Sequence, residues 1–416
     1  MQEENKKNDI KTLSFGCRLN ALESEKIKNM LIPHIPVAVV VNTCAVTAEA
    51  ERQSGQTIRR IARENTNTPI FVTGCAATRN PALFSDIPNV LVIDNFQKRN
   101  LNAYIDAIAK KPCSISGNAS IENLNSTDEK LSKQFVQIQN GCNHDCTYCV
   151  TRLLRGKSVS FEYDEIRNDI QAAVDRGFRE FVLTGVDIAS YARIYDGKAF
   201  LISDLCKRLL NDIPAIKRLR LSSMDPAVPE VGKIIELIKS DERMMNHMHF
   251  SMQSGSDTIL SAMRRRHTAD TVRKWVQTAG TDITFSWDII CGFPGETETL
   301  FKETLDLVRE LKPIKIHAFP FSPRPDTVAA TMQNQINRTV SKQRVKIIND
   351  AANENRANFM RAQVGKTVQV LVEENNIARC PHDIPVKISE QNIPARTICN
   401  VILTGVKNDI FIGKIA

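Results

Sequence analysis

The sequence predicts an α/β protein of three parts: an N-terminal domain with a doubly wound parallel sheet, a central partial (β/α)6 barrel and a small C-terminal β-barrel. Three observations support this prediction. The chain has 416 residues, which is too long for one ordinary domain. Continuous apolar runs alternate with helical patterns over most of its length, which is typical of parallel sheets. Toward the end, short β-branched runs separated by turn residues replace the helices.

The composition indicates a soluble globular protein, with 42% hydrophobic and 25% charged residues. No apolar run approaches the roughly 20 residues needed to cross a bilayer, and the polar start MQEENKKNDI does not resemble a signal peptide. We therefore expect a protein that lies in the cytoplasm and has no membrane partner. Disulfides are rare in that reducing compartment. Its 11 cysteines are then buried small side chains or metal ligands. The net charge of +8 fits an anionic macromolecular partner without identifying one.

Residues 1–110 form the predicted N-terminal domain. Its candidate strands cover residues 36–41, 69–73 and 90–94. A helical pattern occupies residues 48–64, and strands interleaved with helices predict a parallel sheet. Residues 111–133 are polar, rich in Ser and Asn and without periodicity, so we interpret them as a linker.

Residues 134–360 form the predicted central barrel. After the apolar run FVQIQ, its further candidate strands cover residues 181–186, 218–223, 248–253, 284–291 and 315–322. Repeated β/α units of this length give parallel strands, and ligands then bind at the carboxyl ends of the strands. Residues 361–416 are the predicted small β-barrel.

Three cysteines, Cys142, Cys146 and Cys149, stand at the spacing C-x3-C-x2-C in NGCNHDCTYC. A cubane iron–sulfur cluster held by three thiolates leaves one iron open for a ligand that is not protein. Zinc sites usually close with four Cys or His ligands, and no second cysteine pair follows nearby. His144 lies inside the loop and could bind zinc, so a zinc site is one alternative to the cluster. Three cysteines with no metal are the other alternative. The spacing favours the cluster.

With Tyr148 directly before the last cysteine, this motif resembles the signature of radical S-adenosylmethionine enzymes. The resemblance implies a [4Fe–4S] cluster whose open iron binds S-adenosylmethionine and reductively cleaves it. It also implies an external electron donor of the flavodoxin or ferredoxin type. Residues at several predicted strand ends resemble the cofactor contacts of that superfamily: Thr184, Gly185, Asp187, Ser222, Gln253, Asp288 and Gly292. Taken alone, Gly185 is equally well explained by a turn, and Ser222 by a helix cap.

The N-terminal domain carries a second trio, Cys17, Cys44 and Cys75. Two of the three directly follow apolar strands, and the carboxyl ends of parallel strands share one edge of a sheet. Three loops at that edge could bring these cysteines together. Their spacing alone nevertheless favours three buried cysteines without a shared role.

The stretches GCRLN with ESE, NTCAVT and VTGCAA, followed by the triple-cysteine domain and a terminal barrel, resemble the methylthiotransferase family over nearly the whole chain. The resemblance implies that Cys17, Cys44 and Cys75 bind a second [4Fe–4S] cluster. It further implies a TIM-like central barrel and a TRAM-like C-terminal barrel that binds tRNA. The chain departs from the family pattern at VTRLLRG, where a proline usually precedes the Arg-Gly pair, and at Ser160-Phe161, where an Arg often follows the serine.

Within that family, one branch resembles this chain most, through GCRLNALESE, LTGVDIASY, LRLSSMDP, RRRHT and HAFPFSPRPDT. That branch implies insertion of a methylthio group at C2 of N6-threonylcarbamoyladenosine 37 in tRNA. The alternatives are methylthiolation of isopentenyladenosine in tRNA or of an aspartate in a ribosomal protein. A zinc-stabilised nucleic-acid-binding protein is the alternative without enzyme activity.

The basic residues do not by themselves locate an RNA surface. Arg264, Arg265 and Arg266 either contact phosphates or form a solvated face. The barrel contains one aromatic residue, Phe411, so we expect any RNA binding there to use phosphates and backbone shape rather than base stacking. Five cysteines receive no ligand role: Cys113, Cys206, Cys291, Cys380 and Cys399.

Overall fold

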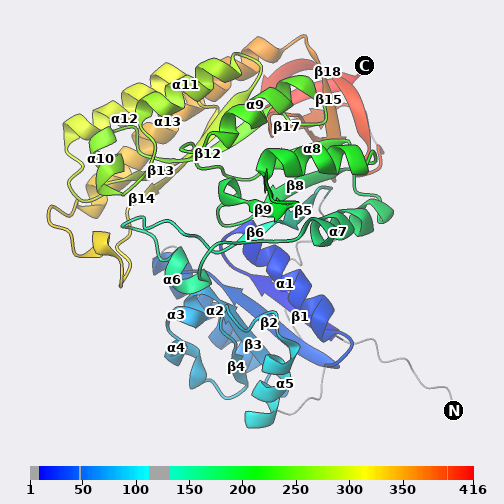
Figure 1. Ribbon diagram of the computed structural model, residues 1–416, viewed down its shortest axis with the longest axis vertical. Coiled ribbons are helices and arrows are strands. Elements are labelled where there is room, and N and C mark those ends of the chain that lie inside the picture. Colours follow the sequence, from blue (N-terminus) through cyan, green and yellow to red (C-terminus); the bar gives the residue numbers. More distant parts are fainter. Residues whose placement is uncertain (1–8, 46–47, 112–131, 391) are drawn as a thin grey trace. The chain divides into compact units, whose positions relative to one another are not determined.

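The computed structural model describes residues 9–45, 48–111, 132–390 and 392–416 (Figure 1). They divide into two compact units. The N-terminal unit contains the described residues up to 111 together with residues 141–143 and 149–157, and the C-terminal unit contains the remainder. Most of the predicted linker, 111–133, lies outside the described residues, as does Cys113.

The N-terminal unit is built on a four-stranded parallel sheet in the order β1-β2-β3-β4. The strands are β1 (Asp9–Ser14), β2 (Val37–Thr43), β3 (Ile70–Gly74) and β4 (Val90–Val92). Every residue of β2 and β3 is buried, which explains why these strands read as continuous apolar runs. The sequence did not predict β1, because its polar residues interrupt the apolar pattern.

Helices cover both faces of this sheet, as expected for a doubly wound fold. Ile58 and Ile61 of α2 pack on one face, and Ile27 of α1 and Tyr104 of α5 pack on the other. The helices are α1 (Arg18–Leu31), α2 (Ala48–Glu64), α3 (Cys75–Arg79), α4 (Ala82–Ser85), α5 (Leu101–Lys110) and α6 (Thr151–Arg155).

The C-terminal unit contains six parallel strands in two sheets, β11-β8-β5 and β12-β13-β14. Single parallel bridges, Leu219 to Met244 and Met224 to Phe250, connect the two sheets between β11 and β12. The strands are β5 (Gln134–Gln137), β8 (Glu180–Thr184), β11 (Arg218–Leu221), β12 (His247–Gln253), β13 (Thr284–Cys291) and β14 (Lys315–Pro320). This arrangement confirms the predicted partial barrel.

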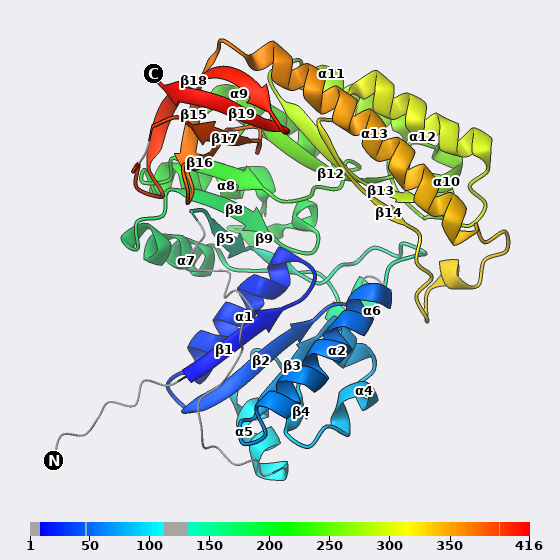
Figure 2. The same cartoon turned by 180° about the vertical axis from the view of Figure 1, so that it is seen from behind.

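Helices follow these strands in the order that a β/α barrel requires, and Figure 2 shows α12 and α13 lying along β13 and β14. They are α7 (Tyr163–Asp175), α8 (Ile202–Asp212), α9 (Glu230–Ser240), α10 (Asp257–Ala262), α11 (Ala269–Ala279), α12 (Glu298–Leu311) and α13 (Arg338–Gln363). Short 3-10 turns span Ile188–Ser190 and Val328–Ala330. Two small antiparallel pairs complete the unit: β6 (Gln139–Asn140) with β7 (Val159–Ser160), and β9 (Ala192–Tyr195) with β10 (Lys198–Leu201).

The last five strands close into the predicted small barrel, in the order β15-β16-β17-β19-β18. They are β15 (Thr367–Val372), β16 (Ile377–Arg379), β17 (Pro385–Ile388), β18 (Ile398–Lys407) and β19 (Ile410–Ile415). Phe411 is buried in the core of this barrel. None of the helices in the described ranges has the length and apolarity that crossing a membrane requires.

A buried ion cluster joins the small barrel to the central strands within the C-terminal unit. Glu180 on β8 is fully buried and accepts hydrogen bonds from Arg218 and Arg220 on β11, with the Arg220 bond 2.6 Å long. Both guanidinium groups also donate to main-chain carbonyls of the barrel, those of Gln369, Arg379, Cys380 and Pro381. Burial raises the pKa of Glu180, but the two arginines outweigh it and lower the pKa to about 2.

We expect Glu180→Gln to lower the free energy of unfolding by about 3–5 kcal/mol, because the change leaves two buried guanidinium groups without their counter-ion. Urea unfolding of the full chain measures the effect. The matched control is Glu310→Gln, which breaks an exposed pair with Arg273 and should cost no more than about 1 kcal/mol. Equal effects of the two changes would contradict the role given to Glu180.

Candidate functional site

The C-x3-C-x2-C loop runs from the end of β6 to the start of α6, and its three cysteines are half-buried. Within the C-terminal unit, Arg265 donates a hydrogen bond to Cys146 Sγ over 3.6 Å. Within the N-terminal unit, the backbone N–H of Thr151 donates to Cys149 Sγ over 3.4 Å. Hydrogen-bond donors of this kind orient sulfur atoms that serve as metal ligands.

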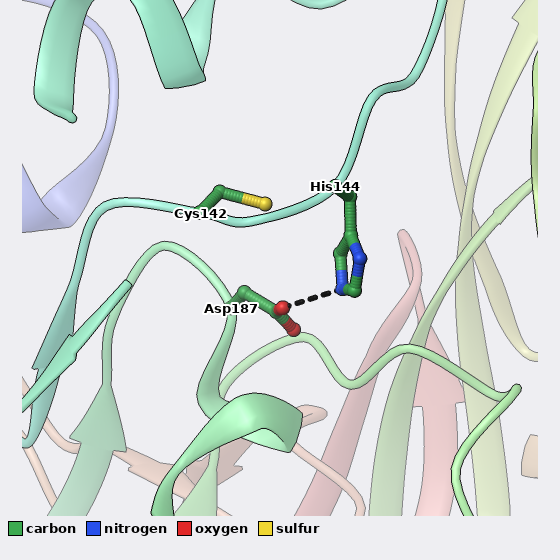
Figure 3. A group of neighbouring side chains, drawn as sticks. All are labelled: Cys142, His144 and Asp187. Carbon is green, nitrogen blue, oxygen red and sulfur yellow. Dashed lines mark ion pairs between the residues drawn. The ribbon is translucent and has the colours of Figure 1, made fainter. Parts of the chain in front are cut away.

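His144, inside the loop, pairs with Asp187 rather than standing free. Its Nε2 lies 2.7 Å from Asp187 Oδ2, and Figure 3 shows the ring pointing at that carboxylate, with Cys142 two residues earlier on the same loop. Asp187 follows β8, and its N–H and that of Val186 donate to Gln139 Oε1 over 2.9 and 3.0 Å. The predicted strand-end residue Asp187 therefore braces the loop that carries Cys146.

Asp225 is a buried residue of the site that the sequence did not single out. It follows β11 and receives hydrogen bonds from Arg266 (2.9 Å) and from the N–H of Ala227 (3.0 Å), with Arg265 Nη2 3.3 Å away. Burial raises the pKa of Asp225, but Arg265, Ala227 and Arg266 outweigh it and lower the pKa. The sequence could have pointed to Asp225 only through its position, three residues after Ser222 at the end of a predicted strand.

The basic run Arg264–Arg266 is therefore divided among three roles. Arg264 pairs with exposed Asp145 in the cysteine loop. Arg265 is buried between Cys146 and Asp225, and half-exposed Arg266 also contacts Asp225. Neither of the two readings made from the sequence, phosphate contact or solvated face, describes Arg265.

Asp288 lies within β13 between two histidines that the sequence analysis missed. Its carboxylate oxygens are 3.1 Å from His249 Nε2 on β12 and 3.4 Å from His317 Nδ1 on β14. Ser286 Oγ lies 2.6 Å from His249 Nδ1 and so orients that ring. Burial raises the pKa of Asp288, but the two histidines outweigh it and bring the pKa to about 2. The sequence could have revealed His249, because polar and apolar residues alternate in HMHF. This alternation places His247 and His249 on the same side of β12.

The other predicted contacts also lie at carboxyl ends of strands. Thr184 ends β8 and is buried, followed by Gly185. Ser222 follows β11, and among the described residues its buried hydroxyl has no hydrogen-bond partner. Gln253 ends β12 with a left-handed φ of 69°. Cys291 is buried as predicted, and burial raises the pKa of its thiol far above the usual range.

Gly292 follows β13, and no other residue fits at this position, because α13 lies directly against it. Its φ is +78°, and a Cβ there would lie 1.9 Å from Ser341 Oγ on α13. Its N–H donates to the buried carboxylate of Glu296 over 2.6 Å. The glycine therefore allows α13 to approach the strand end closely.

The cysteines of the second trio follow the carboxyl ends of three neighbouring strands in the sheet of the N-terminal unit. Ser14, Asn42 and Thr73 are in register on β1, β2 and β3, and the cysteines follow within three residues, as Cys17, Cys44 and Cys75. A Cβ on Gly16 would lie 2.4 Å from Cys44 Sγ, so the turn before Cys17 passes directly against that sulfur. Side-chain bonds fasten the same turns: Asn20 Nδ2 donates to the carbonyls of Phe15 (2.8 Å) and Thr43 (3.1 Å).

Two polar residues behind this edge act on the cysteines. Asn95 Nδ2 donates to Cys75 Sγ over 3.7 Å. Arg155 has its pKa raised far above the usual range although burial lowers it, because Glu23, Cys75 and Cys17 lie close to it. The donor set of three thiols, one of them buried, with cationic and amide donors behind it, fits an iron–sulfur cluster.

The fold and site define an α/β-barrel enzyme of the radical S-adenosylmethionine class. The family model described as "Radical SAM superfamily" matches residues 136–308, and the one described as "Uncharacterized protein family UPF0004" matches residues 9–94.

Named relatives extend over nearly the whole chain. The chain is 37% identical to "Threonylcarbamoyladenosine tRNA methylthiotransferase MtaB" of Rickettsia prowazekii, over 91% of each chain. It is 33% identical to the protein of the same name from Bacillus subtilis, over 80% of this chain and 77% of the other. It is 32% identical to "tRNA-2-methylthio-N(6)-dimethylallyladenosine synthase" of Erythrobacter litoralis, over 86% and 85%.

The chain therefore belongs to the radical S-adenosylmethionine methylthiotransferase family and is an enzyme that uses a [4Fe–4S] cluster and S-adenosylmethionine. This membership decides against the alternative of a zinc-stabilised binding protein. Among solved structures, the methyltransferase TsrM from Kitasatospora setae has a similar fold, with a TM-score of 0.56 at 15% identity over 75% of this chain and 69% of that one.

We expect Gly292→Ala to destabilise the protein more than Gly295→Ala does. Both glycines have positive φ, which costs an L-residue about 1–2 kcal/mol, but nothing lies within 4 Å of a Cβ at Gly295. The Cβ at position 292 would also collide with Ser341, which adds about 1–3 kcal/mol of overpacking. Thermal unfolding compares the two variants, and equal losses of stability would show that contact with α13 does not matter.

Proposed function

We propose that this enzyme inserts a methylthio group at C2 of N6-threonylcarbamoyladenosine 37 in tRNA, beside the anticodon. The observation that carries the proposal is the presence of two cysteine trios, one in the C-x3-C-x2-C loop and one gathered at the sheet edge of the N-terminal unit. Relatives named as threonylcarbamoyladenosine tRNA methylthiotransferases, at 30–37% identity, support the substrate.

Cys142, Cys146 and Cys149 are the proposed ligands of the [4Fe–4S] cluster that binds S-adenosylmethionine. Once bound, this cluster supplies the electron that cleaves the sulfonium and begins the radical reaction. The protein's own contribution is to hold the sulfurs in place: Arg265 donates to Cys146, and the Thr151 N–H donates to Cys149. A flavodoxin- or ferredoxin-type protein is the proposed electron donor.

Cys17, Cys44 and Cys75 are the proposed ligands of a second [4Fe–4S] cluster, which would supply the sulfur to be inserted. Two observations support this: each cysteine follows a strand end at the same edge of the sheet, and Gly16 leaves room for Cys44 Sγ beside the first turn. Three protein ligands leave one iron free for a sulfur ligand, the same logic as in the loop trio.

Seven residues at or near the carboxyl ends of strands are the proposed contacts to S-adenosylmethionine: Thr184, Gly185, Asp187, Ser222, Gln253, Asp288 and Gly292. The buried Ser222 hydroxyl without a partner among the described residues supports this assignment, because a cofactor hydroxyl or carboxylate would satisfy it. Gln253 supports it through its left-handed backbone, a strained conformation that clusters at ligand sites. Asp187 and Asp288 hold His144 and His249 in fixed orientations.

The small barrel is the proposed tRNA-binding element. Phe411, its single aromatic residue, is buried and cannot stack on a base. Binding would therefore use phosphates and backbone shape and weaken as salt is added. The target base must leave any stack before it can react.

Methylthiolation of isopentenyladenosine in tRNA is the second candidate function. Relatives named as tRNA-2-methylthio-N(6)-dimethylallyladenosine synthases reach 32% and 31% identity over 86% of this chain, close to the values for the first group.

Cys142→Ala should abolish reductive cleavage of S-adenosylmethionine, because the loop cluster loses a ligand. Cys44→Ala should keep the cleavage and lose sulfur insertion. Formation of 5′-deoxyadenosine and of modified nucleoside measures the two steps separately. Cys399→Ala in the small barrel is the matched control and should keep both. Persistent insertion by Cys44→Ala would remove the second cluster from the proposal.

Deletion of the gene should remove the 2-methylthio derivative of N6-threonylcarbamoyladenosine from tRNA and leave the isopentenyladenosine derivative unchanged. Nucleoside mass spectrometry of total tRNA distinguishes the two products. The reverse pattern would assign the chain to the second candidate function, and re-expression of the wild-type chain should restore whichever nucleoside was lost.

A further inference from the structure

Three charged side chains form a buried cluster in the N-terminal unit. Lys98 Nζ lies 2.6 Å from Glu23 Oε2, and Arg155 Nη1 lies 2.9 Å from Glu23 Oε1. Their side chains are 1%, 2% and 4% exposed for Lys98, Glu23 and Arg155. Glu23 comes from α1, Arg155 from α6 and Lys98 from the turn before α5.

The cluster holds two positive charges against one negative charge. Burial raises the pKa of Glu23, but Lys98 and Arg155 lower it to about 2, so the carboxylate is ionised. Burial lowers the pKa of Lys98 to about 8, which leaves the amine mostly protonated at neutral pH. Arg155 is always charged. The three side chains together therefore carry a net positive charge, and they are buried.

The groups that face this surplus charge include two of the second cysteine trio. Besides Glu23, Cys75 and Cys17 lie close enough to Arg155 for their thiolates to raise its pKa, and Cys75 lies close enough to Lys98 to do the same. Asn95 bridges the two sites, because its Oδ1 accepts from Lys98 Nζ over 2.9 Å while its Nδ2 donates to Cys75 Sγ. Arg155 Nη2 also donates to Asn20 Oδ1 over 2.6 Å, and Asn20 fastens the turn that carries Cys17.

We propose that Lys98 and Arg155 are electrostatic positioning residues of the second cluster, whose charge they balance from behind the cysteines. An oxidised [4Fe–4S] core held by three thiolates carries a net charge of about −1, equal and opposite to the buried surplus. Nearby positive charge favours the reduced, more negative state of a cluster and so raises its reduction potential. This inference rests on the proposed second cluster.

The test removes one positive charge and measures the midpoint potential. Lys98→Met is the appropriate change, because Glu23 and Arg155 remain as a balanced pair. It is made in full-length Cys142→Ala protein, where the second cluster can be titrated alone by redox potentiometry with electron paramagnetic resonance. We expect the potential to become more negative than in the parent. Lys110→Met, which removes an exposed lysine of the same unit, should leave it unchanged.

A second variant of opposite sign completes the design. Glu23→Gln removes the negative charge and should move the potential in the positive direction. Loss of iron from Lys98→Met but not from Lys110→Met would equally support the inference, since the unmatched cluster would be retained poorly. Equal midpoint potentials in the Lys98→Met and Lys110→Met proteins would overturn the inference. Absence of iron and sulfide from the parent itself would instead defeat the proposed second cluster, so the two failures are distinguishable.

Discussion

The parallel pairing of strands is the constraint on which both sites depend. In the N-terminal unit, register between β1, β2 and β3 places Ser14, Asn42 and Thr73 side by side and brings Cys17, Cys44 and Cys75 to one edge. In the C-terminal unit, β8, β11, β12 and β13 end with Asp187, Ser222, Gln253 and Gly292 nearby. A slip of one residue in any of these pairings would move the residues that follow the strand ends out of line with one another. Chemistry that needs several distant residues is therefore secured by main-chain hydrogen bonds that no single side chain controls.

Much of the fold could be predicted because burial leaves a visible pattern. Strands β2 and β3 are buried on both faces and read as apolar runs, whereas edge strand β1 is only partly buried and reads as polar sequence. The loop trio could be predicted for a similar reason, since its three cysteines are local and their spacing is itself the signal. The second trio could not, because its members lie about thirty residues apart and spacing alone favours separate buried thiols. Resemblance to a family suggested their association, and the register of β1, β2 and β3 supports it.

The remaining site residues could not be predicted because charged side chains look alike in a sequence. Arg264, Arg265 and Arg266 are identical neighbours, yet the first and third are about half exposed, whereas the second is buried against Cys146 and Asp225. Asp288 meets His249 and His317 only after three strands have paired, and Glu23 meets Arg155 across more than a hundred residues. Long-range partners decide whether such a residue is a solvated charge or part of a buried network, and neither periodicity nor local motif carries that information.

Arg218 and Arg220 hold the small barrel through its main chain, which leaves the side chains of the barrel free to vary. Their guanidinium groups bind main-chain oxygens at Gln369, Arg379, Cys380 and Pro381, which every amino acid presents. These bonds do not depend on the identity of the barrel side chains, unlike the pairs of Lys133 with Asp383 and of Thr284 with His382. The side chains on the outer surface of the small barrel can therefore change while its anchoring to the central strands stays intact. Because the small barrel is attached through its polypeptide backbone, its surface residues can be substituted in evolution without loss of that attachment.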